Sequence, residues 1–525
     1  MLYNTRYNKS GGIKFMRKTM EKMKEKKAIT LIALVVTIAV ILILAGITVG
    51  MVTSDNGVLK ETKNAKTLAE IDNEKSIVER AKMLTMMRSK NGSITYEVFE
   101  PALKEEAGKI PTEVSDAMGT IEVLFTDSNR YYEIDEDGNV SEPQEVVKDE
   151  NAGDITKGGR CDGSEEKPYE ISCIEDLVVL SNMSNGKGIK LEDGKTVEIT
   201  NVETFKDKYV ILTRNLNFKS KYSYRDSENT GFGDLNGDGK IETIMQELQK
   251  EKGYTPIQFF YGNMNGNYKA IKNIYIYNKE MRYAGFFSKI DSGTTIKNFT
   301  ISGEINSEGG YVGGIAGTVS NDGKNGKIDN CHNYANIYGN GYAGGLIGYI
   351  QNSSNIAQIV NCSNRGTVKN TTNNYYAGGI VANTDSTVLK IEQCYNTGDV
   401  VGCGIAANNK SFINNCYNTG KTEYGLVINN QNEVKNCYSI GECTYKCLIR
   451  KTDYTASHIF NCFSEKNFVD KITLSGTVDD ISEIFESGYM KTNEFLKYLN
   501  DDNVWIRDTT NINNGYPILK WQVDQ

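Results

Sequence analysis

The residues with the clearest spacing for chemistry form a short acidic loop that begins at Asp234. Counting from that residue, oxygen-bearing side chains stand at positions 1, 3 and 5, glycine at position 6 and glutamate at position 9, as in a calcium-binding loop. Position 12, where such loops place a bidentate carboxylate, is Met245, and Glu247 follows two residues later. Two interpretations stay open, a weak Ca2+ site or a turn rich in Asp, Asn and Gly. The candidate calcium ligands are Asp234, Asn236, Asp238, Lys240 and Glu242.

Histidine, which most hydrolytic sites need, is nearly absent from this chain. The 525 residues include two histidines, His332 and His458, and no HExxH motif, which argues against zinc hydrolases and Ser-His-Asp enzymes. The net charge is −8 and no basic domain follows the first 27 residues, which argues against a nucleic-acid partner. No column of Asp or Glu recurs through the repeat described below, so a paired-carboxylate glycosidase site cannot be located. We therefore expect no enzymatic activity.

The dominant sequence feature is a tetrapeptide that recurs from Tyr268 onward. It consists of Ile or Val, any residue, Asn or Gln, and an apolar residue that is mostly Cys. Eight copies begin at Ile271, Ile296, Ile328, Ile359, Ile391, Ile413, Val434 and Ile459, with spacings of 25, 32, 31, 32, 22, 21 and 25 residues. Repetition at such intervals indicates a solenoid.

A second, glycine-rich motif alternates with the first. In its fuller copies Tyr, a small residue and two glycines precede an apolar residue. The glycines of this motif are Gly313, Gly314, Gly317, Gly344, Gly345, Gly348, Gly378 and Gly379. Because Gly and Asn interrupt every repeat, no helix of ten residues fits, and short strands remain. Further glycines, such as Gly366 and Gly398, follow the fourth tetrapeptide position by four residues, and we expect them at corners that need positive φ.

Stacked short strands predict a parallel β-helix, right-handed and mainly β, in which equivalent side chains lie over one another about 4.8 Å apart. The Ile and Cys positions would form apolar ladders inside it, and the Asn column would join amide to amide. The ladder residues are Asn330, Cys331, Asn361, Cys362, Cys394, Asn415, Cys416, Asn436, Cys437, Asn461 and Cys462.

Eleven cysteines in an exported chain raise the question of disulfides. Six of them hold the ladder position, where we expect buried, reduced thiols acting as small hydrophobes. The pairs left for bridging are Cys161 with Cys173 and Cys443 with Cys447, and we expect Cys403 to be a turn substitution.

Tyrosines recur through the repeats and suggest an aromatic stripe. Such a stripe could bind glycans or proteins, or could face solvent without a function. Its members are Tyr311, Tyr334, Tyr342, Tyr375, Tyr376, Tyr395, Tyr417 and Tyr438.

The segments Gly313–Gly317 and Gly344–Gly348 resemble the GLUG motif of bacterial surface proteins. Stretches 163–182 and 212–218 resemble the segments that usually precede these repeats, and 514–522 resembles the usual C-terminal segment. The resemblance implies an extracellular, adhesive or structural solenoid and names no ligand. GLUG repeats also accompany immunoglobulin-cleaving metalloproteases, a use that the missing HExxH excludes here.

Residues 28–52 form a 25-residue run without a charge, and about 20 residues suffice to cross a bilayer. Nine basic residues precede it, so we expect a cytoplasmic N-terminus and an exported remainder. The start of this run resembles type IV prepilins and pseudopilins, which implies cleavage between Ala28 and Ile29. The glutamate usual at the fifth mature position is Ala33 in this chain.

These patterns divide the chain into five parts and give three hypotheses for its function. The parts are a basic leader at 1–27, a transmembrane helix at 28–52, a pilin-like helix with a small sheet at 53–140, a linker at 141–160 and a GLUG-type β-helix with capping segments at 161–525. The first hypothesis is a non-enzymatic adhesin or display module in the membrane of a Gram-positive anaerobe, with a glycan or protein ligand. The second is a minor pseudopilin that assembles with pilus or secretion subunits, and the third is a carbohydrate-active β-helix enzyme.

The prepilin resemblance makes a direct prediction about the mature N-terminus. If prepilin peptidase processes the chain, N-terminal sequencing of protein from its native envelope will begin at Ile29, with a methylated amino group. A chain that still begins near Met1 would contradict processing and indicate a plain signal anchor.

Overall fold

The computed structural model describes residues 58–523 apart from short stretches. Those stretches are 90–92, 118–119, 126–127, 129, 136–137, 146–152, 188, 191–195, 198–200, 219–252, 279–280, 321–324, 352–356, 373–375, 453–456, 477, 479–481 and 500–502. The predicted transmembrane helix, the Ala28–Ile29 cleavage site and the calcium loop from Asp234 to Glu242 lie outside the described residues. Among the helices that are described, none is long and apolar enough to cross a membrane.

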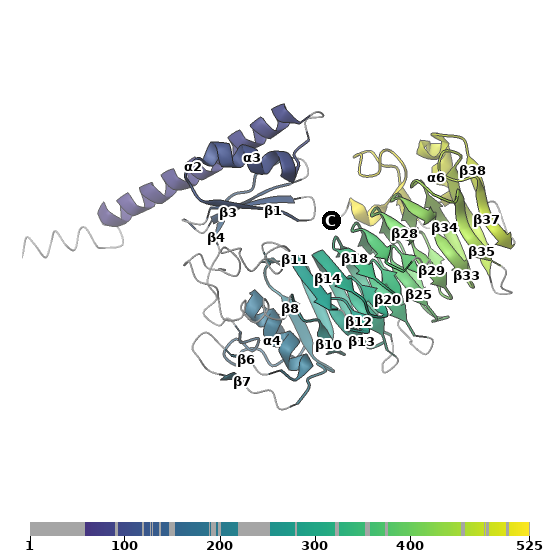
Figure 1. Cartoon of the computed structure of the whole chain (residues 1–525), viewed down its shortest axis with the longest axis horizontal. Coiled ribbons are helices and arrows are strands. Elements are labelled where there is room, and N and C mark those ends of the chain that lie inside the picture. The colour runs from purple at the N-terminus through teal and green to yellow at the C-terminus, as the bar shows by residue number, and fades with distance from the viewer. Residues whose placement is uncertain are drawn as a thin grey trace, which may run out of the picture.

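The N-terminal module, residues 58–145, is a long helix packed on a small antiparallel sheet (Figure 1). Its elements are α2 (Val58–Arg88), α3 (Tyr96–Ala107), β1 (Thr112–Ala117), β2 (Thr120–Phe125), β3 (Arg130–Ile134) and β4 (Gln144–Glu145). Val78 and Ala81 of α2 are buried against Phe99 and Val123. Leu68, by contrast, is 62% exposed, and the apolar residues of α2 that are described as buried lie in its C-terminal half.

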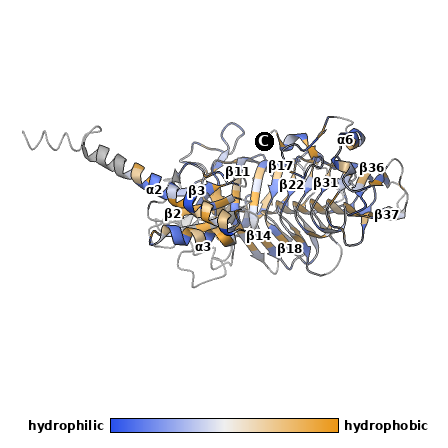
Figure 2. Ribbon diagram, turned by 90° about the horizontal axis from the view of Figure 1, so that it is seen from above, coloured by the Kyte–Doolittle hydropathy of each residue, from blue (hydrophilic) through white to orange (hydrophobic). Residues whose placement is uncertain are grey.

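The rest of the chain is mainly β and forms large parallel sheets, stacked in the manner of a β-helix solenoid (Figures 1 and 2). One face is a nine-stranded sheet with one strand from each successive coil. Its strands are β10 (Ile257–Phe260), β13 (Phe287–Ile290), β16 (Ala316–Val319), β20 (Ile347–Ile350), β25 (Val381–Thr384), β29 (Ala406–Asn409), β33 (Val427–Asn430), β35 (Cys447–Thr452) and β37 (Lys471–Gly476).

A second set of parallel strands opens successive coils, and the tetrapeptides lie on its members from residue 263 onward. The strands of this set are β5 (Tyr169–Ile171), β8 (Tyr209–Leu212), β11 (Asn263–Asn278), β14 (Thr295–Ser307), β17 (Lys327–Asn333), β21 (Gln358–Val360), β26 (Lys390–Glu392), β30 (Phe412–Asn414), β34 (Glu433–Ser439) and β36 (His458–Glu465). The remaining strands of the coils are β9 (Leu216–Asn217), β12 (Tyr283–Ala284), β15 (Tyr311–Gly313), β18 (Asn336–Gly339), β19 (Tyr342–Gly344), β22 (Ser363–Asn364), β23 (Val368–Asn370), β24 (Ala377–Gly378), β27 (Tyr395–Asn396), β28 (Val400–Cys403), β31 (Tyr417–Asn418), β32 (Thr422–Tyr424) and β38 (Glu483–Phe485).

The strand register corrects the first copy of the repeat. Met264, not Ile271, pairs with Ile296, and Ile271 pairs instead with Leu216 and Ile301 in the next column. The true spacing between the first two positions of this column is therefore 296 − 264 = 32 residues, which matches the next three spacings of 32, 31 and 32. The tetrapeptide at Ile271 is a local coincidence, because a strand as long as β11 contributes to two columns.

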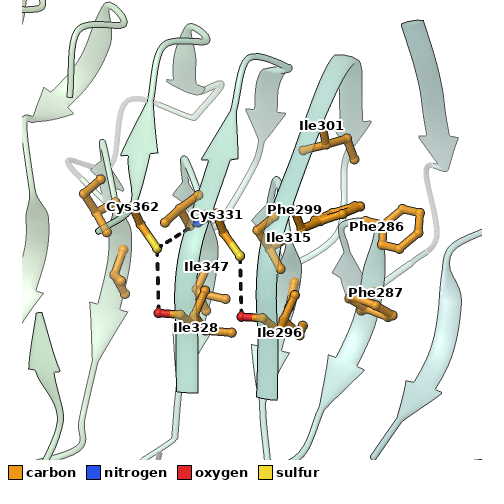
Figure 3. Packing of buried hydrophobic residues seen from close by; sticks show 14 of the residues in the cluster. Phe286, Phe287, Ile296, Phe299, Ile301, Ile315, Ile328, Cys331, Ile347 and Cys362 are labelled. Carbon is orange, nitrogen blue, oxygen red and sulfur yellow. Dashed lines mark hydrogen bonds between the residues drawn. The ribbon is translucent and has the colours of Figure 1, made fainter. Parts of the chain in front are cut away.

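The Ile and Cys columns form the predicted interior ladders (Figure 3). Ile328, Ile359 and Ile391 stack in register. Phe299 takes the Cys position in its coil and pairs with Cys331. All of these side chains are fully buried. Each ladder thiol donates a weak hydrogen bond to the carbonyl two residues earlier, at 2.9–3.3 Å.

The column of the third tetrapeptide position has a backbone role that corrects the sequence interpretation. Asn298, Asn330 and their equivalents have φ between 48° and 54°, so it is this column, and not Gly366 or Gly398, that makes the left-handed turn. Asn tolerates this conformation better than most residues. The side-chain amides of this column are linked directly to one another only in part. Asn330 Nδ2 donates to Asn298 Oδ1 at 3.0 Å, and Asn461 Nδ2 donates to Asn436 Oδ1 at 3.0 Å. Asn361 instead donates to Asp329.

A second column of amides, two residues beyond each Cys, was missed in the sequence analysis. Asn333, Asn364, Asn396 and Asn418 are fully buried, and each donates one amide hydrogen to the side chain of the next coil at 2.7–3.0 Å. The other amide hydrogen goes to a carbonyl two residues along the same coil, at 2.7–3.0 Å. We name this column, which ends at Ser439, the inner amide ladder.

The motif glycines are required for space. A Cβ atom on any of the eight would lie closer than 3.0 Å to a neighbouring atom. At Gly314, Gly345 and Gly379 the obstacles include the side chain of the inner amide ladder and the carbonyl of the next coil. The corner glycines Gly366 and Gly398 likewise face a carbonyl of the preceding coil at a distance that excludes Cβ. Close approach between coils is therefore the reason for these glycines.

Both ends of the β-helix are covered. At the first coil, α4 (Ile174–Asn185) lies against β10, and Ser184 Oγ donates to the Phe259 carbonyl at 2.9 Å. After α4 in the sequence, β6 (Ile189–Lys190) and β7 (Thr196–Val197) form an antiparallel pair. Lys157, in the stretch expected to be a linker, forms a buried 2.6 Å ion pair with Asp176. The last coils are followed by η2 (Tyr489–Lys491), α6 (Asn493–Leu499), β39 (Trp505–Ile506), β40 (Ile518–Leu519) and η3 (Lys520–Gln522).

A matched pair of glycine substitutions tests the close approach between coils. We expect Gly345→Ala to destabilise the fold by at least about 2 kcal/mol, because the new methyl group overlaps the Gly379 carbonyl and the Asn364 side chain. Gly310→Ala should be nearly neutral, since the nearest atom to its Cβ is 3.5 Å away. Thermal unfolding followed by circular dichroism measures both, and equal midpoints would contradict the packing argument.

Candidate functional site

Most tyrosines of the predicted stripe separate into a buried group and a surface group, whereas Tyr334 belongs to neither and is partly exposed. Tyr395, Tyr417 and Tyr438 are almost fully buried and stack in register, with ring centroids 5.0 and 5.2 Å apart. They lie beneath residues 503–523, which we name the C-terminal strap. These three tyrosines therefore offer no surface to a ligand, because the end of the chain already covers them.

The C-terminal strap is held by both tryptophans of the chain. Trp505 Nε1 donates to Asn415 Oδ1 at 3.0 Å, and Trp521 Nε1 donates to the Gln393 carbonyl at 3.0 Å. The Trp521 ring stacks on His332 and on Tyr395, at 5.8 and 5.6 Å. Burial lowers the pKa of His332 to about 4, so His332 is a neutral structural residue and a poor proton carrier near pH 7.

The surface group forms a cluster on consecutive coils. We name Tyr283, Tyr311, Tyr342, Tyr349 and Tyr376 the tyrosine cluster; Tyr375 lies outside the described residues. Tyr283, Tyr311 and Tyr342 occupy equivalent positions on β12, β15 and β19, with centroids 5.5 and 5.3 Å apart. Tyr349 of β20 stacks on Tyr311 at 4.9 Å. The sequence pattern found three of these residues and missed Tyr283 as a ligand candidate and Tyr349 altogether.

The stacking decides what the cluster can bind. Tyr311 and Tyr342 are nearly parallel, at 7°, so they cover each other's faces and present mainly ring edges and hydroxyls. The guanidinium of Arg282 lies 5.5 Å from the Tyr283 ring and 5.8 Å from the Tyr311 ring. Tyr376 differs, since it meets Tyr342 edge-on at 65° and is 37% exposed. Tyr376 is therefore the member best placed to stack a ring face on a ligand.

Polar groups around the cluster are already ordered. The Tyr349 hydroxyl donates to Asp385 at 2.7 Å, and Lys410 forms an ion pair with the same carboxylate at 2.8 Å. Burial raises the pKa of Tyr342 and of Tyr349 above the ordinary value, so both hydroxyls are neutral at pH 7. Exposed Thr372, four residues before Tyr376 in the sequence, donates to the Asn340 carbonyl at 2.7 Å. A fixed surface of Tyr, Asn and Thr suits recognition by hydrogen bonds and ring contacts.

The other candidate residues have structural environments. All eleven cysteines are free in the structure, and burial raises the pKa of the ladder thiols Cys331, Cys394, Cys416 and Cys437. Cys403 pairs with Gly378 in the glycine column and is buried. Cys443 donates to the Cys447 carbonyl at 3.4 Å. Over the described ranges, no group of three His, Cys, Asp or Glu side chains is arranged to hold a metal ion.

Comparison with known proteins gives little further guidance. No protein-family model matches the chain, and no curated protein matches it. One solved structure is similar, described as "a putative immunoglobulin A1 protease" from Bacteroides ovatus. It has 18% identity and a TM-score of 0.38 over 69% of this chain and 94% of that chain, and so low a score carries no argument about fold or function.

The environment of the ladder thiols predicts their reactivity. We expect Cys331, Cys394, Cys416 and Cys437 to resist alkylation by iodoacetamide at pH 8, because they are buried and the thiolate is disfavoured. The same thiols should react fully in denaturant, as mass spectrometry of peptides would measure. Rapid labelling of the native protein at these positions would contradict the closed interior.

Proposed function

We propose that this chain is a non-enzymatic, membrane-anchored surface protein whose β-helix displays a binding surface, in the manner of an adhesin. In this proposal the solenoid is a right-handed, GLUG-type β-helix, and residues 28–52 anchor it with most of the chain outside the cell. The observation that carries the proposal is the tyrosine cluster, an ordered aromatic and polar surface over an interior devoted to packing. Its ligand would be a glycan or a protein.

The interior supports a role without catalysis. The inner amide ladder uses its amide hydrogens within the fold, and the ladder thiols are buried. His332 is held by Ser363 and Asn330 at 2.9 and 3.0 Å and covered by Trp521. Side chains with these contacts are engaged in structure, which leaves the coil surface for recognition.

A second candidate function is that of a minor pseudopilin. A long helix lies on a small antiparallel sheet in the N-terminal module, and Leu68 on the helix is 62% exposed, as a residue packing against another subunit would be. Under this proposal prepilin peptidase removes residues 1–28 and the helix enters a fibre with other subunits.

Binding by the tyrosine cluster can be tested with full-length protein in detergent on an array of host and plant glycans. For a glycan that the unsubstituted protein binds on the array, we expect Tyr376→Ala to weaken binding about tenfold, the effect of losing one aromatic anchor. Tyr268→Ala is the matched control, because Tyr268 is 73% exposed on β11 outside the cluster. Equal losses for the two variants, or hydrolysis of the glycan, would contradict the proposal; the second result would favour an enzyme.

A further inference from the structure

The N-terminal module and the β-helix meet through a small cluster of charges. Lys272 of β11 forms an ion pair with Glu122 of β2, and its amino group lies 3.0 Å from Glu133 of β3. Asn217 of β9 also donates a hydrogen bond to Glu122. Figures 1 and 2 show the sheet of the module beside the first coils, where these strands lie. Two segments of the β-helix thus converge on two strands of the module.

The position of the two glutamates is unusual for an isolated sheet. Glu122 and Glu133 are direct partners across the antiparallel strands β2 and β3. Like charges in this arrangement repel each other and destabilise a sheet. Their carboxylates lie close enough together for one cation of the β-helix, the Lys272 ammonium group, to contact both. The pair therefore fits a site for an ammonium group better than it fits a solvent-facing sheet.

Two of the three charged residues are also withdrawn from water, whereas the Glu133 side chain is 23% exposed. Lys272 is 5% exposed and Glu122 is 8% exposed. Burial opposes the positive charge on Lys272, but the two carboxylates outweigh it and raise the pKa of Lys272. Tyr131, also on β3, has its pKa raised to about 12 by burial and by Glu133 and Glu122, so it is a neutral neighbour. A buried charge left without its partner is costly, which makes Lys272 and Glu122 mutually dependent, and Glu133 adds a second, partly exposed carboxylate to the same ammonium group.

We infer that Glu122, Glu133 and Lys272 form an interdomain latch that fixes the β-helix in one orientation on the N-terminal module. The glutamate pair is the receiving surface and the Lys272 ammonium is the group it recognises. Because α2 belongs to the module, the latch also sets the angle between α2 and the solenoid.

The latch makes a distinctive prediction about three variants. Lys272→Met leaves two glutamates facing each other, and the double variant Glu122→Gln with Glu133→Gln leaves a buried ammonium group unpaired. Each of these two variants should separate the β-helix from the N-terminal module. The triple variant, in which all three charges are removed together (K272M/E122Q/E133Q), has no uncompensated charge and should dock again.

Docking can be measured by the distance between fluorophores placed at Met87 and Val388, which are 78% and 53% exposed, in the full chain in detergent. The labelled protein with Glu122, Glu133 and Lys272 intact should give one narrow distribution of distances between the fluorophores. Lys272→Met and the Gln double variant should raise the undocked population at least about tenfold, and the triple variant should restore the narrow distribution.

A control and two contrary results complete the test. Lys421→Met removes a lysine from an exposed ion pair with Glu442 at 3.1 Å and should leave the distribution unchanged. An unchanged distribution for Lys272→Met would overturn the latch. A triple variant as broadly distributed as Lys272→Met would also overturn it, because apolar contact or folding, and not charge, would then control docking.

Discussion

A column of buried amides is the constraint around which the β-helix is built. The amides of Asn333, Asn364, Asn396 and Asn418 lie in an interior that excludes water, where an unpaired amide is costly. Each is satisfied by the next coil and by its own coil, so a change in one coil affects the next. The motif glycines follow from this arrangement, because the backbone that passes the ladder has no room for a Cβ atom.

The same stacking explains why so many conspicuous residues are structural. Equivalent positions on successive coils lie in contact, so Ile, Cys, Asn and Tyr each form a column. A column can be covered or exposed, and its residue type does not decide which. Tyr395 and Tyr417 are covered by the C-terminal strap, whereas Tyr311 and Tyr342 remain partly exposed at the surface. Only the columns that no later segment covers are accessible at the surface.

The N-terminal module joins this solenoid by charge as well as by chain connection. Glu122 and Glu133 would oppose each other within their own sheet, and Lys272 from the β-helix resolves that conflict. The module also has a core of its own, in which Val78, Phe99 and Val123 meet. The module is therefore packed around its own core and meets the solenoid through a charged face.

The sequence by itself determined the repeat, the parallel stacking of short strands and the apolar columns of Ile and Cys, because equivalent residues of a solenoid recur at the interval of a coil. The sequence also contains the pattern of the inner amide ladder, an Asn or Ser two residues after each ladder Cys, but periodicity alone does not show that these side chains are buried. Tertiary structure alone decided that Ile271 belongs to another column, that Asn rather than Gly makes the left-handed turn, and that the strap covers three tyrosines. Those outcomes depend on register and on contacts between residues as distant as Tyr417 and Gln522, and local residue patterns do not encode such pairings.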